Sequence, residues 1–148
     1  MQTEHESMQY LEGVANMFSR DVAVLLEDSA FGQGLVLGNN LFIGNMPSTP
    51  DFCVSLYDIG GTPAVSALDR SYSTEPEVSV QIRTHSYPIG HEMGENIRKY
   101  FNKMVNVQLQ DGSYVVIMCI SSVEYMKADE KGRTLFIMKL RAIFSEEE

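Results

Sequence analysis

The chain has 148 residues, of which 44% are hydrophobic, 9% aromatic and 21% charged. This composition is typical of a folded globular protein, and the length fits a single domain over residues 1–148. The net charge is −9. Because tight DNA binding needs clustered Lys and Arg side chains, this balance disfavours a DNA-binding role.

Charge is distributed unevenly along the chain. Residues 1–69 carry nine acidic side chains and one basic one, whereas residues 70–144 carry ten basic and eight acidic ones. Residues 145–148 form an acidic C-terminal tail. Two interpretations stay open: the charge keeps the protein soluble, or acidic and basic surfaces of neighbouring subunits meet.

Cys53 and Cys119 lie in apolar runs without a CxxC spacing. This favours buried free thiols over a disulfide, and therefore a reducing compartment. No run approaches the roughly 18 apolar residues of a membrane span, and the acidic start of the chain is unlike a signal peptide. We therefore expect the protein to be made in the cytosol, with no membrane partner.

Two amphipathic helices are predicted. Thr3 and Glu6 form a capping box before apolar residues at alternating spacings of three and four, which predicts a long helix ending near Ser29. A short coiled-coil seam is the alternative to a globular helix face. The second helix follows Pro88, and its apolar face consists of Met93, Ile97, Tyr100, Phe101 and Met104.

The remaining patterns predict strands. Residues 52–57 form a short buried strand that ends at Gly60 and Gly61, and residues 78–85 alternate as a half-exposed strand. Residues 105–110 lead through the turn at 111–112 into a returning strand, 114–125, whose two apolar faces indicate a central position. After a turn at 127–132, the last strand places Lys139 and Arg141 on its polar face.

The stretch from 58 to 76 has no usable periodicity, so we predict a long loop that serves assembly. The order of elements predicts an α+β fold. It consists of an antiparallel or mixed β-sheet of about four to five strands with two α-helices packed on one face.

No sequence pattern predicts a nucleotide-binding, metal-binding or catalytic site. Gly32, Gly34 and Gly38 follow a predicted helix, whereas a dinucleotide loop lies between a strand and a helix. His85 and His91 lack the spacing of a zinc-binding helix, and no GxSxG elbow occurs. We therefore predict a protein without catalytic residues, metal or cofactors.

A resemblance to a known family lies in residues 41–63. There an apolar-Gly-x-x-Pro-x-x-Pro turn from Leu41 to Pro50 precedes a short strand and a Gly-Gly-x-Pro turn that ends at Pro63. This block resembles the bacteriophage minor capsid and tail-terminator (tail-completion) proteins of long-tailed phages. Residues 80–87 and the helix that follows resemble the same family, and the likeness spans roughly residues 5–144.

The resemblance implies a structural virion protein and not an enzyme. It implies a ring of about six subunits at the head-proximal end of the tail tube. Such a ring terminates tail polymerisation and joins the tail-tube protein to the head-completion or connector proteins. Genome DNA would pass through its lumen without specific binding, and the protein would be present in the host cytoplasm during assembly and in the virion afterwards.

If the resemblance holds, the long loop and the polar strand faces are candidates for subunit or tube contact. The candidate contact residues are Asp58, Gly60, Gly61, Pro63, Asp69, Arg70, Tyr72, Arg83, Arg98, Lys139 and Arg141. Three other functions stay open. They are a head-closure or neck adaptor protein, a small monomeric binding module, and an enzyme with a hidden cleft.

Overall fold

The computed structural model of the chain describes residues 17–29, 34–62, 75–104, 107–108 and 114–144. Two helices and seven strands lie in these residues. In chain order they are α2 (Phe18–Glu27), β1 (Leu41–Ile43), β2 (Cys53–Thr62), β3 (Glu75–Thr84), α3 (Tyr87–Asn102), β4 (Val107–Gln108), β5 (Tyr114–Cys119), β6 (Glu124–Ala128) and β7 (Thr134–Phe144).

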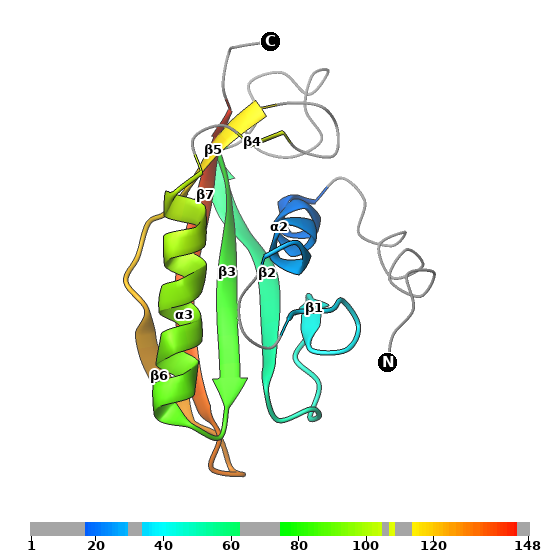
Figure 1. Cartoon of the computed structure of the whole chain (residues 1–148), viewed down its shortest axis with the longest axis vertical. Coiled ribbons are helices and arrows are strands. Elements are labelled where there is room, and N and C mark those ends of the chain that lie inside the picture. Colours follow the sequence, from blue (N-terminus) through cyan, green and yellow to red (C-terminus); the bar gives the residue numbers. More distant parts are fainter. Residues whose placement is uncertain (1–16, 30–33, 63–74, 105–106, 109–113, 145–148) are drawn as a thin grey trace.

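The strands form one mixed sheet in the order β1-β2-β3-β7-β5-β4 (Figure 1). β1 runs parallel to β2, and the other pairs are antiparallel. β5 and β6 pair with successive stretches of the same edge of β7. The predicted α+β class is confirmed, and the described residues contain seven strands instead of the predicted four to five.

Both helices pack on one face of the sheet, as the order of elements predicts (Figure 1). Val80 in β3 and Met138 in β7 are fully buried in the same core cluster as Phe18 of α2 and Ile97 of α3. A hydrogen bond from the Tyr100 hydroxyl to the Leu25 carbonyl oxygen, 2.9 Å long, ties the two helices together. The core therefore lies between one helical layer and one sheet.

The prediction of one central strand over residues 114–125 is wrong in two respects. Residues 120–123 divide it into β5 and β6, and the centre of the sheet is formed by β3 and β7. Val116 and Met118, which suggested burial on both faces, are only half-buried. The hairpin itself is confirmed, because β4 pairs with β5, and the turn at 111–112 lies outside the described residues.

β2 does not end at the glycine pair. It continues to Thr62, and β3 begins at Glu75, so both ends of the predicted 58–76 loop are strand. A shift of register between Ile59 and Gly61 marks a β-bulge at Gly60, which breaks the two-residue alternation of the sequence. Residues 63–74 lie outside the described residues.

α2 begins at Phe18. Because Met17 before it is extended, the predicted single helix from residue 3 to near Ser29 is wrong. Residues 1–16 lie outside the described residues. Met17 provides no side-chain cap, but the Asp58 carboxylate of β2 accepts hydrogen bonds from the Ser19 backbone N–H, at 3.1 Å, and from the Ser19 hydroxyl. A carboxylate distant in sequence therefore caps this helix.

α3 confirms the predicted second helix. Ser86 is its N-cap, and Met93, Ile97 and Phe101 are buried as predicted. Two glycines let the helix approach the sheet closely. A Cβ at Gly90 would lie 2.8 Å from the Phe136 ring, and one at Gly94 would lie 2.6 Å from the Val123 side chain.

Candidate functional site

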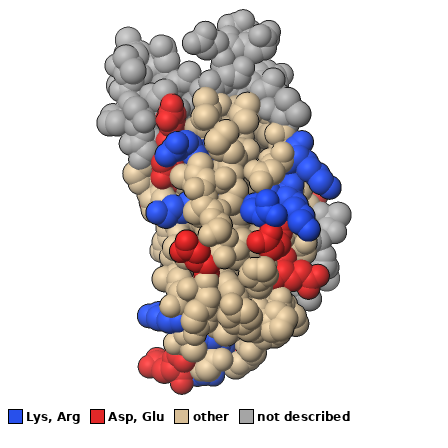
Figure 2. All heavy atoms as spheres, turned by 90° about the vertical axis from the view of Figure 1, so that its left-hand side faces the viewer, with Lys and Arg blue, Asp and Glu red and all other residues tan. Residues whose placement is uncertain are grey.

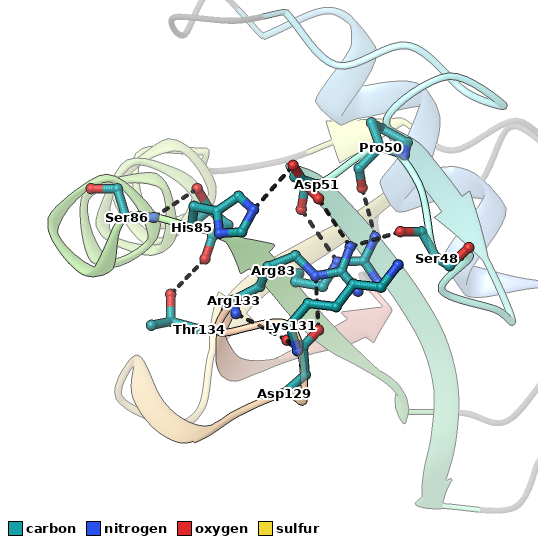
Figure 3. A network of polar contacts seen from close by, with 11 residues as sticks. Ser48, Pro50, Asp51, Arg83, His85, Ser86, Asp129, Lys131, Arg133 and Thr134 are labelled. Atoms are coloured by element: carbon teal, nitrogen blue, oxygen red, sulfur yellow. Dashed lines mark hydrogen bonds and ion pairs between the residues drawn. The ribbon is translucent and has the colours of Figure 1, made fainter.

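Arg83 was predicted as a subunit contact, but the structure buries it beneath the turn that precedes β2 (Figure 3). Its side chain donates hydrogen bonds to the backbone oxygens of Pro50, at 2.6 Å, and Asp51, at 3.2 Å. Cys53 lies opposite Arg83 in the β2–β3 register, which brings the guanidinium to these carbonyls. The charge of Arg83 therefore serves a contact within the chain.

A second buried arginine holds the same turn. Arg133 donates to the Ser48 carbonyl oxygen at 2.7 Å and pairs with the carboxylates of Asp129, at 2.8 Å, and Asp51, at 3.2 Å. The other Asp51 oxygen lies 3.1 Å from Nε2 of His85. Residues 48–51, with these two arginines, are called the arginine-tethered turn below.

Asp129 completes this network at the turn between β6 and β7. Its carboxylate accepts hydrogen bonds from the backbone N–H groups of Lys131 and Arg133, each at 2.9 Å. Desolvation opposes the charged form, but the hydrogen bonds and the Arg133 charge outweigh it and lower the pKa of Asp129. The network is therefore a set of mutually satisfied polar groups.

Two other predicted cations also have partners within the chain. Arg98 pairs with Glu95 of the same helix at 2.7 Å. Arg141 donates two hydrogen bonds, at 3.0 and 2.7 Å, to one carboxylate oxygen of Glu77. Lys139 is exposed, and no ion pair joins it to another described residue.

Three of the predicted contact residues lie in β2: Asp58, Gly60 and Gly61. Asp58 caps α2, and Gly60 lies exposed in the bulge next to Gly61. Four further predicted contacts lie outside the described residues: Pro63, Asp69, Arg70 and Tyr72.

The polar faces of the two predicted amphipathic strands come together in the structure. β3 pairs with β7, so that Ser79 lies opposite Lys139 and Gln81 lies opposite Ile137. Because the alternate residues of both strands pack against the helices, these side chains face the other way. We call these residues, together with Tyr57 of β2, the helix-free face. Lys139 is exposed in it and Ser79 is buried, whereas the other three are half-buried.

The surroundings of the two thiols oppose the thiolate form. Burial raises the pKa of the Cys53 thiol, and it also raises the pKa of Cys119, whose Sγ contacts the Ser121 carbonyl oxygen at 2.9 Å. Cys119 is only half-buried, which differs from the predicted full burial. Within the described residues no group of three His, Cys, Asp or Glu side chains could hold a metal ion.

Exposed apolar side chains at the start of α3 and in β6 were missed by sequence reasoning. Tyr87 is 51% exposed, Ile89 49%, Tyr125 47% and Met126 44%. The rings of Tyr87 and Tyr125 lie 5.6 Å apart, and both rest on the buried Phe136 ring, at 4.9 and 5.9 Å. We call these four exposed residues the α3–β6 patch.

Figure 2 shows the side of the molecule that carries α3 and β6. Uncharged surface runs along this side between separate groups of Lys, Arg, Asp and Glu side chains. Sequence reasoning assigned Tyr125 to the end of a central strand and left Ile89 unassigned. An apolar residue in the first turn of a helix gives no indication of whether it faces the core or the solvent.

No helix in the described part of the chain is both long and apolar enough to cross a membrane. Comparison with curated proteins gave no significant match. A family profile described as "Bacteriophage tail terminator protein" matches residues 27–146. This match covers most of the chain, including every described strand and α3, and confirms the resemblance found in residues 41–63. The chain therefore belongs to the bacteriophage tail terminator family, whose members are structural proteins of the virion tail.

Proposed function

We propose that the protein assembles as a ring of about six subunits at the head-proximal end of a phage tail tube. There it stops tail polymerisation and forms the joint between the tail-tube protein and the head-completion proteins. The family match over residues 27–146 carries this proposal. Assembly takes place in the host cytoplasm, before the ring becomes part of the virion.

The described polar groups support a structural role and not an enzymatic one. The buried arginines bind backbone carbonyls and carboxylates of their own chain, and burial raises the pKa of both thiols. A nucleophile needs a lowered pKa or a neighbouring base, and a raised thiol pKa works against that. The net charge of −9 also suits a lumen through which DNA slides without binding.

The helix-free face is our proposed contact between neighbouring subunits. It combines apolar surface from Tyr57 and Ile137 with the exposed ammonium group of Lys139. Subunit interfaces commonly combine an apolar centre with a polar rim. The predicted loop residues Pro63, Asp69, Arg70 and Tyr72 stay candidates for the same contact or for contact with the tube.

The mass of the purified protein in solution tests this proposal. Native mass spectrometry or light scattering, over a range of concentration and salt, should find a discrete species of about 100 kDa, six times the 16.6 kDa chain. A monomer that forms this species only when tail-tube protein is added would also support the proposal.

Two outcomes would favour the other functions. A protein that binds the head connector but ignores tube protein would be a head-closure or neck adaptor protein. A monomer at every concentration that binds neither would be a small binding module. Either result would contradict the terminator function.

A further inference from the structure

Ser55 of β2 and Ser79 of β3 bury their hydroxyl groups completely. The two residues are 0% and 4% exposed. Neither hydroxyl forms a hydrogen bond with any residue that the structure describes. Buried hydroxyls in proteins nearly always have a partner, because burial removes their hydrogen bonds to bulk water. Two such groups on neighbouring strands therefore indicate a bound partner from outside the chain.

β2 and β3 lie side by side (Figure 1), and their register places the two serines on one diagonal of a block of four residues. Ser55 lies opposite Gln81, and Tyr57 lies opposite Ser79. All four side chains point away from the helices, because alternate residues such as Val80 lie in the helix-covered core. Diagonal neighbours have Cα atoms roughly 7–8 Å apart and Cβ atoms closer together. One water molecule spans two oxygens that are about 5.5 Å apart, so it can bond to both serines.

The other two residues of the block provide space and further polar atoms. Tyr57 and Gln81 have longer side chains than serine and are half-buried, so they extend past the serines towards the surface. Burial raises the pKa of Tyr57, and the nearby Ser55 hydroxyl opposes this effect. The Ser55 and Tyr57 hydroxyls are therefore neighbours. Buried waters typically form about three hydrogen bonds, and Tyr57 offers the third.

The charges around the block favour a neutral molecule over an ion. Burial raises the pKa of Cys53 and of Tyr57, whereas the positive charge of Arg83 acts on both groups in the opposite direction. The same charge would repel a metal cation, and no residue of the block is a carboxylate that could compensate it. Hydroxyl groups both donate and accept hydrogen bonds, as water does.

We propose that Ser55 and Ser79 bind one ordered water molecule between β2 and β3, with the Tyr57 hydroxyl as its third partner. The water joins the two strands through their side chains and restrains Tyr57. Because Tyr57 belongs to the helix-free face, the water also fixes part of the surface that we propose for subunit contact. The site lies within one chain, so its test does not depend on whether a ring forms.

Replacement of the two serines by alanine, singly and together, tests the site by chemical denaturation. Ser55→Ala and Ser79→Ala should each raise the equilibrium constant for unfolding at least about threefold, because each removes a hydrogen bond to the water. The double variant should be no less stable than the less stable single variant, because the loss of either serine already releases the shared water.

Ser48→Ala is the control, since it removes an exposed serine side chain and should leave the unfolding constant unchanged. Single variants at least as stable as the wild type would overturn the proposal, because alanine would then only remove a hydroxyl that has no partner. Additive losses in the double variant would contradict a shared water.

A high-resolution crystal structure of the wild type gives a second readout that does not depend on any variant. It should show a water within about 3.2 Å of both serine oxygens and of the Tyr57 hydroxyl. Clear density for these side chains without a water between them would also overturn the proposal.

Discussion

The arginine-tethered turn and the α3–β6 patch lie at the same end of the sheet and use their side chains in opposite ways. At the turn, Arg83 and Arg133 are each only 4% exposed and bind groups of their own chain. At the patch, Tyr87 and Ile89 are about half exposed although they are apolar. A charged residue in the sequence therefore need not lie at a surface contact. Where a turn leaves backbone carbonyls without partners, a buried arginine can donate hydrogen bonds to them.

The largest expected effect comes from opening the arginine-tethered turn. Arg83→Met keeps most of the side-chain volume but removes the donors to the Pro50 and Asp51 carbonyls. We expect a loss of about 2–4 kcal/mol in the free energy of unfolding, because two hydrogen bonds from a buried charged donor are lost. Chemical denaturation measures it.

Arg98→Met is the control for Arg83→Met. Arg98 forms a partly exposed pair with Glu95 of the same helix, so its loss should change stability by less than about 0.5 kcal/mol. Equal effects of the two substitutions would mean that the buried tether contributes no more than a surface ion pair.

A second change tests the support under the patch. Gly90→Ala introduces a Cβ that would meet the Phe136 ring and the Thr84 methyl group at 2.8 Å. Although alanine favours helices, overpacking should destabilise the protein by about 1–3 kcal/mol. A rise in the melting temperature, as expected from helix propensity alone, would show that α3 does not lie this close to β7.

Asp58→Ala should have a smaller effect. It removes the carboxylate that accepts two hydrogen bonds from Ser19 at the start of α2. We expect a loss of about 1 kcal/mol, the usual cost of a missing helix cap. Asp58→Asn retains an acceptor and should recover most of the melting temperature, whereas no difference from wild type in Asp58→Ala would contradict the capping role.

The smallest expected effect is on the stability of the fold at acidic pH. The folded-state pKa of Asp129 lies below its ordinary value of 3.8. A group with a lowered folded-state pKa stabilises the fold above its unfolded-state pKa, and this contribution is lost as pH falls through the folded-state value. Between about pH 6 and about pH 2 the wild type should therefore lose more stability than Asp129→Asn. Parallel losses, followed by urea denaturation at each pH, would contradict this role of Asp129.

Local patterns were sufficient to predict much of the fold. The alternation of Val78, Val80 and Ile82 gave β3, and the spacing of Met93 and Ile97 gave the buried face of α3. These patterns depend on the period of each element, which the sequence carries directly.

Features that depend on contacts between residues distant in the sequence could not be predicted. β1 has three residues and is held by parallel pairing to β2. α2 begins where Asp58, 39 residues away, provides its cap. The bulge at Gly60 resembled the end of a strand, and the exposure of Ile89 depends on how α3 sits over β7. Periodicity within a segment carries no information on such contacts.

The most direct test of the terminator function is the length of tail tubes assembled in vitro. Tail-tube protein would polymerise with and without this protein, and electron microscopy would measure the lengths and examine the ends. The proposed function predicts tubes that stop growing, with a ring of this protein on one end. Tubes that elongate equally in its presence, with bare ends, would contradict it.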